Sequence, residues 1–157
     1  MKKVLVAGFG NILLGDEGVG IHVIRELQKL NLPPHVEVVD LGVNSTLLID
    51  IFPNYDKIII VDALVLTGKP GEVQKLSAEE LLQVPRSSKV SLHEIDLPLT
   101  LEVCKQLYGS LKEVKIIGIE VEADSLHEVN LRLSSKAESA VKKAVCMILD
   151  ELGVVNV

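Results

Sequence analysis

The chain has 157 residues, of which 48% are hydrophobic and 3% aromatic, and its formal net charge is −6 with a pI of about 5.2. This acidic balance excludes a surface that attracts nucleic acid or anionic membranes, and no apolar run is long enough to span a bilayer. We therefore expect neither a nucleic-acid nor a membrane partner. The length suits one domain over residues 1–157, with a core of aliphatic side chains as in buried parallel strands.

The first half of the chain alternates strand and helix patterns. In order, we expect a strand at 4–7, a one-sided helix at 19–30, a strand at 36–40, a helix at 45–51 with Ser45 as its cap, and a strand at 58–61. The last of these, Ile58-Ile-Ile-Val61, is the strongest strand signal because all of its residues are β-branched. The alternation predicts a βαβαβ unit with parallel strands.

The second half adds less regular elements. They are an edge or antiparallel strand at 72–76, a short helix opened by the capping box Ser77-Ala-Glu-Glu80, a helix at 97–107, a strand at 114–121, an irregular stretch at 122–133, and a helix at 134–152 stopped by Gly153. The whole pattern predicts an α/β fold: a single three-layer α/β/α domain around a mainly parallel, mixed twisted sheet of about five strands.

The two cysteines carry no catalytic or disulfide signature. Cys104 and Cys146 stand far apart within predicted helices, with neither C-x-x-C spacing nor an adjacent histidine. We expect both to be core thiols of a reduced, cytoplasmic protein. The apolar stretch after the two N-terminal lysines is short, interrupted by glycine and followed at once by acidic residues, unlike a signal peptide.

The loop between Gly8 and Gly20 invites comparison with nucleotide-binding loops. A dinucleotide fingerprint needs a third glycine where this chain has Leu13, and a P-loop needs Lys and Ser/Thr where it has Asp16 and Glu17. Two carboxylates repel phosphate, so the loop suits a cation or a polar uncharged group better. The alternative is that Asp16 caps a helix and Glu17 stabilises its positive end.

Two further carboxylates follow predicted strands. Parallel strands present their carboxyl ends at one sheet edge, where Glu17, Asp40 and Asp62 would gather. Asp62 comes after four apolar residues, so its burial demands a partner, a backbone donor or a metal, although it could also cap the next loop. Asp40 precedes Leu41-Gly42 and equally fits ordinary turn chemistry. A proton shared by Asp40 and Asp62 is a third possibility if the two lie within reach.

His93, in the segment Ser91-Leu-His93, would complete a divalent metal site, since two carboxylates and one imidazole leave open coordination positions. A single loop histidine is nevertheless more often exposed than a ligand. The other histidines, His22, His35 and His127, we treat as background. No H-E-x-x-H, G-x-S-x-G or cysteine–base arrangement is present.

Three segments together resemble a known family: Gly8-Phe-Gly-Asn-Ile-Leu-Leu-Gly-Asp-Glu-Gly-Val-Gly20, Asp62-Ala63 and Ser91-Leu-His93. In residues, order, spacing and total length they are similar to the nickel-iron hydrogenase maturation endopeptidases. The resemblance implies that Glu17, Asp62 and His93 bind nickel. It also implies that the chain removes a C-terminal extension from the precursor of a nickel-iron hydrogenase large subunit once nickel is in place, so that the metal arrives with the substrate.

The catalytic base is less defined by the resemblance. Asp40 is our first candidate and Asp16 our second. Leu41 stands where the family usually has glycine, which weakens any backbone role that needs glycine there, and Glu120-Val-Glu-Ala-Asp124 departs from the usual Pro- or Gln-containing pattern. The alternative function is a binding module that inspects nickel on the precursor without cleaving it.

Overall fold

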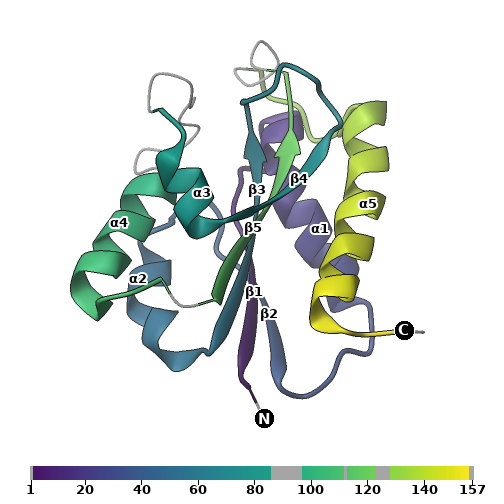
Figure 1. Ribbon diagram of the computed structural model, residues 1–157. Helices are drawn as coiled ribbons and strands as arrows, with labels where there is room; N and C mark the ends of the chain where they lie inside the picture. Colours follow the sequence, from purple (N-terminus) through teal and green to yellow (C-terminus); the bar gives the residue numbers. More distant parts are fainter. Residues whose placement is uncertain (1, 86–96, 112, 123–127, 156–157) are drawn as a thin grey trace.

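A five-stranded mixed sheet forms the centre of the molecule (Figure 1). The computed structural model describes residues 2–85, 97–111, 113–122 and 128–155. The strands are β1 (Val4–Gly8), β2 (Val36–Asp40), β3 (Lys57–Leu64), β4 (Val73–Ser77) and β5 (Glu113–Glu120). Their order is β2-β1-β3-β5-β4, with β4 antiparallel to β5 at one edge and all other pairs parallel. The predicted α/β class, the mixed sheet and the antiparallel edge strand are confirmed.

Helices cover both faces of this sheet, which gives the predicted three layers. Helices α1 (Val19–Gln28) and α5 (Ser135–Leu152) lie on one face, and α2 (Leu47–Ile51), α3 (Ala78–Gln83) and α4 (Leu97–Tyr108) lie on the other, as Figure 1 shows. Two short 3-10 helices, η1 (Gly15–Gly18) and η2 (Phe52–Asn54), complete the described elements. Among the helices in the described ranges, none combines the length and hydrophobicity that a bilayer crossing requires.

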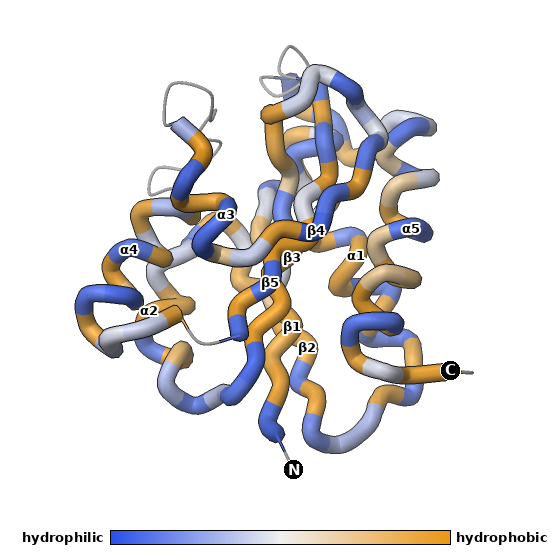
Figure 2. The backbone as a smooth tube through the Cα atoms, in the orientation of Figure 1, coloured by the Kyte–Doolittle hydropathy of each residue, from blue (hydrophilic) through white to orange (hydrophobic). Residues whose placement is uncertain are grey.

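The core divides into two halves because successive residues of a strand face opposite sides of the sheet. In β3, Ile58 and Ile60 belong to the half under α3 and α4, whereas Ile59 and Val61 belong to the half under α1 and α5. All five residues of β1 are buried. Figure 2 shows the consequence, a hydrophobic central sheet between helices of mixed hydropathy.

Several predicted boundaries shift in ways that matter for the site. Strand β3 continues to Leu64, so Asp62 lies within the strand and not after it. The reason is that β5 pairs in parallel with β3 as far as the residues Leu64 and Glu120, which extends the hydrogen-bonded ladder. The prediction that Asp62 ends its strand is therefore wrong by two residues.

Two side-chain expectations are also wrong. Ser45 does not cap α2, which begins at Leu47; instead Ser45 is buried, with its Oγ 2.9 Å from the Oγ1 of Thr100 in α4. Cys104 is buried as expected, but Cys146 is exposed because it lies off the buried face of α5. By contrast, the capping box is confirmed, since Ser77 accepts from the Glu80 N–H and Glu80 accepts from the Ser77 N–H.

Candidate functional site

The glycine-rich loop after β1 folds back tightly on itself at the carboxyl edge of the sheet. A Cβ added to Gly10, whose φ is 148°, would lie 2.6 Å from the carbonyl oxygen of Glu17. A Cβ added to Gly20 would lie 2.5 Å from the Phe9 oxygen and 2.7 Å from the Val61 oxygen. Such distances are too short for a side chain, so glycine is required at both positions. The loop therefore places η1, which carries Glu17, directly against the end of β3.

Glu17 and Asp62 are two of the buried carboxylates at this edge. Glu17 is 1% exposed and Asp62 is 4% exposed. They follow or lie on the adjacent strands β1 and β3, which are joined beyond their last pair by a 3.0 Å hydrogen bond from Phe9 N–H to the Val61 carbonyl. Asp62 also accepts the Ala63 N–H at 2.8 Å. Burial of two carboxylates costs free energy, which a divalent cation would offset.

His93, the third predicted metal ligand, lies outside the described residues, as does Ser91. The described ranges by themselves contain no group of three His, Cys, Asp or Glu side chains that could hold a metal ion. The chain is described again from Leu97, at the start of α4. The first turn of that helix is fixed to the loop after β2 by the buried contact between Thr100 and Ser45.

Asp40, the predicted base, is exposed at the end of β2. Its Oδ1 accepts the Gly42 N–H at 2.8 Å, and Gly42 has a φ of 59°. This is the turn chemistry that the sequence left open as an alternative. The loop after β2 is joined to the glycine-rich loop after β1, because Gly10 donates its N–H to the Gly42 carbonyl at 2.9 Å. Asp40 thus borders the same edge as Glu17, with one carboxylate oxygen held in the turn.

The sheet register separates Asp40 from Asp62. Asp40 pairs with Gly8, and Gly8 pairs with Val61, so that β1 lies between the two aspartate-bearing strands. Two strand spacings amount to about 10 Å. The two residues also differ in face: a Cβ at Gly8 points towards Ile24 of α1, whereas Asp62 is in phase with Ile58 and Ile60 on the other side. This geometry does not support one proton shared between them.

Asp16, the second candidate base, has both carboxylate oxygens occupied. Oδ1 accepts the Ser134 N–H at 2.7 Å, and Oδ2 accepts the Ser134 hydroxyl at 2.6 Å. Neither η1 nor α1 has a side-chain cap, so Asp16 does not cap its own helix. It contacts instead the N-cap residue of α5, far along the chain.

Glu120 is a buried carboxylate at this edge whose structural role the sequence reasoning missed. It is 2% exposed, and its Oε1 accepts three backbone N–H groups, from Leu66 at 2.7 Å, Thr67 at 2.8 Å and Gly68 at 3.0 Å. Those residues form the loop that follows β3. The available signal was an acidic residue directly after the apolar run of β5, the same pattern that marked Asp62. Glu120 therefore fixes the chain that leaves Asp62.

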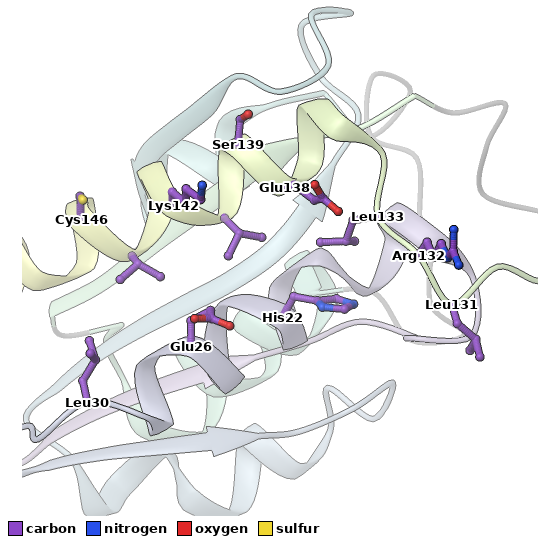
Figure 3. Close-up of a pocket in the computed structure, with 12 residues that line it drawn as sticks. His22, Glu26, Leu30, Leu131, Arg132, Leu133, Glu138, Ser139, Lys142 and Cys146 are labelled. Carbon is purple, nitrogen blue, oxygen red and sulfur yellow. The ribbon is translucent and has the colours of Figure 1, made fainter.

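A separate cavity lies between α1 and α5 (Figure 3). Its volume is about 790 Å³, and it is lined by apolar side chains, including Val141 and Val145, and by charged side chains such as Glu26 and Lys142. His22 lines it from α1, and burial, followed by the charge of Arg25, lowers the pKa of this histidine. Neither Glu17 nor Asp62 contributes to the cavity, so it is not the predicted metal site.

Known proteins with the same architecture identify the family. A family model described as "Hydrogenase maturation protease" matches residues 21–151. The hydrogenase 2 maturation protease of Escherichia coli is 31% identical over 154 residues, which is 96% of this chain and 90% of that protein.

Two solved structures agree with this match. The hydrogenase maturating endopeptidase HybD of E. coli superposes with a TM-score of 0.81 at 29% identity, covering 96% of this chain and 92% of that one. The [NiFe] hydrogenase maturation protease HybD of Thermococcus kodakarensis gives a TM-score of 0.76 at 27% identity, covering 96% and 98%.

Proposed function

Because this chain belongs to the hydrogenase maturation protease family, and is therefore a peptidase, we propose that it removes the C-terminal extension from a nickel-loaded precursor of a nickel-iron hydrogenase large subunit. The observation that carries the proposal is the burial of Glu17, in η1 after β1, and of Asp62, on the adjacent strand β3, at the carboxyl edge of the sheet. Free cysteines, as found at Cys104 and Cys146, are usual in a reducing compartment, and we place the reaction in the cytoplasm.

In this proposal Glu17, Asp62 and His93 recognise nickel that the substrate carries. Two carboxylates and one imidazole are hard to borderline ligands, whereas nickel in the precursor is held by soft cysteine thiolates. A three-ligand site with open positions contacts such a metal without displacing the thiolates. Recognition then depends on the loaded state of the precursor, which prevents cleavage before nickel insertion.

The proposed chemistry is hydrolysis of one peptide bond. A water molecule attacks the scissile carbonyl, the base takes the proton of that water, and the amine leaves with a proton. Asp40 ranks first as the base because it is exposed and has one oxygen outside the turn bond, while both oxygens of Asp16 are occupied by Ser134. Nickel on the substrate would polarise the scissile region or the attacking water.

A cleavage assay tests the proposal against the alternative of a non-cleaving, nickel-sensing binding module. Nickel-loaded and nickel-free large-subunit precursors are incubated with the protein, and the shortened product is measured by mass spectrometry. The E. coli hydrogenase 2 maturation protease with the hydrogenase 2 precursor serves as the positive control.

We expect cleavage of a loaded precursor and none of its nickel-free form. Binding of loaded precursor without product would favour the binding module. Equal cleavage of both forms would contradict nickel recognition.

A further inference from the structure

The loop that carries Glu17 is hydrogen-bonded to the segment that leads into α5. Asn130 donates its N–H to the Leu13 carbonyl at 2.8 Å, and Gly15 donates its N–H to the Asn130 carbonyl at 2.6 Å. The Asp16 carboxylate then receives both the backbone N–H and the hydroxyl of Ser134. These contacts fix the backbone on the amino side of Glu17 to a second, distant part of the chain.

Ser134 connects this loop to a rigid element. It is the N-cap of α5, and its Oγ accepts the Ala137 N–H at 3.2 Å while its hydroxyl hydrogen goes to Asp16. Helix α5 has 18 residues and packs on the sheet through buried alanines, among them Ala137, Ala140 and Ala144. The carboxylate of Asp16 also lies at the amino end of this helix, where the helix dipole favours negative charge.

We propose that Asp16 is a positioning residue for Glu17, and not a base. Asp16 directly precedes Glu17 in η1, so the contact with Ser134 sets the direction in which the next side chain leaves the backbone. Both Asp16 oxygens already accept hydrogen bonds from Ser134, which leaves the carboxylate poorly placed to take a proton from water. This inference rests on the proposed function, in which Glu17 contacts nickel.

The isosteric variant Asp16→Asn separates positioning from base catalysis. An asparagine oxygen still accepts the Ser134 N–H, and its amide can donate to the Ser134 Oγ, which has lone pairs available. The contact therefore survives while the carboxylate is lost. Asp16→Ala removes the contact entirely, and Ser134→Ala removes only the half made by the hydroxyl.

The matched control is Ser77→Ala. Ser77 caps α3 in the same way that Ser134 caps α5, and a lost cap typically costs about 1 kcal/mol. Within the described ranges Ser77 is hydrogen-bonded to Glu80 and not to the Glu17 loop, so Ser77→Ala reproduces the loss of stability without the loss of positioning.

Three measurements are made on each variant: kcat and KM on nickel-loaded precursor, the affinity of the protein for Ni²⁺ alone by calorimetry, and hydrogen exchange of the peptide covering residues 9–20. For Asp16→Ala we expect faster exchange, weaker Ni²⁺ binding and a kcat/KM lowered by about tenfold or more, since small misplacements of reacting groups have effects of this size. Ser134→Ala should be intermediate. Asp16→Asn should stay within about threefold of wild type in kcat/KM, since the geometry is kept.

Two outcomes would overturn the inference. If Asp16→Asn lost about 10²-fold or more of kcat with unchanged exchange, Asp16 would be a base. If Asp16→Ala behaved like Ser77→Ala in all three measurements, the contact would be structural only. If wild type cleaved no loaded precursor, the proposed function would fail, but exchange and Ni²⁺ binding would still decide whether Asp16 positions Glu17.

Discussion

Gly20 lies against the carbonyl oxygen of Val61, so close that a Cβ would be only 2.7 Å away. This contact joins the first turn of α1, which directly follows Glu17 and η1, to the strand that carries Asp62. Because the neighbouring atoms are backbone, a larger residue cannot be accommodated by a side-chain rotation.

Gly20→Ala should therefore be destabilising, although alanine favours helices. We expect a loss of about 1–3 kcal/mol in the free energy of unfolding, measured by urea denaturation. Arg25→Ala, at an exposed position of the same helix, should change it by no more than about 0.5 kcal/mol. A stabilised Gly20→Ala would show that α1 is not in contact with β3 at this position.

Glu17→Gln should weaken processing of nickel-loaded precursor. The substitution keeps the size of the side chain and removes its charge, so we expect kcat/KM to fall by at least about tenfold, as metal affinity commonly falls about 10–100-fold even when only the orientation of a ligand is lost. Asp62→Asn and His93→Ala should lower kcat/KM by a similar factor. The control is Glu26→Gln on the exposed side of α1, for which unchanged processing is expected.

Asp40→Asn should lower kcat by about 10²-fold or more while KM changes little, because general-base catalysis contributes effects of this size. Asparagine still accepts the Gly42 N–H, so the turn is preserved. Asp56→Asn is a matched control, since Asp56 accepts the Lys3 N–H at the opposite end of the sheet. Normal processing by Asp40→Asn would rule out Asp40 as the base.

Glu120→Ala should loosen the loop after β3. Hydrogen bonds to a charged group contribute about 1.5–3 kcal/mol, and three N–H groups lose their acceptor at once. We expect lower stability in urea and faster hydrogen exchange at residues 66–68, with Glu120→Gln less affected because it keeps an acceptor oxygen. Exchange in Glu120→Ala equal to that of wild type would mean that the loop is held by other contacts.

Glu151 should make stability depend on pH. Its hydrogen bond with Lys75, at 3.0 Å, and the nearby Lys57 lower the pKa of this carboxyl group from its usual 4.5. A carboxyl group with a lowered folded-state pKa stabilises the protein above the unfolded-state value, and this contribution disappears as the pH falls through the folded-state value.

The difference in free energy of unfolding between wild type and Glu151→Gln should consequently have its maximum above about pH 5 and decrease progressively below pH 4.5. Urea denaturation at several pH values measures it, with Glu138→Gln at an exposed position of the same helix as the control. A difference that does not vary with pH would contradict the ion-pair account.

The fold was predictable because its signals are local. Apolar runs such as Ile58–Val61 and the one-sided pattern of α1 identify buried strands and a covering helix without reference to distant residues. The strand limits were less predictable: β3 extends past Asp62 because its partner β5 continues to Glu120, and no local window contains both strands.

The position of Glu17, Asp40 and Asp62 at one edge of the sheet was predictable from the strand pattern, but the hydrogen bonds around them were not. Ser45 had the sequence context of a helix cap, yet tertiary packing pairs it with Thr100. The roles of Asp16 and Glu120 depend on contacts with Ser134 and with residues 66–68, which only the folded chain brings together. Propensities describe what a segment can do alone, and these contacts join segments far apart.

The partners in the Asp16–Ser134 contact are separated by 118 positions in the chain. During synthesis, strands β1 and β3 emerge long before α5, so the Glu17 loop exists for a time without its anchor. If Asp16 positions Glu17 as proposed, a growing chain can form the sheet edge but cannot fix Glu17 until its own last helix has left the ribosome.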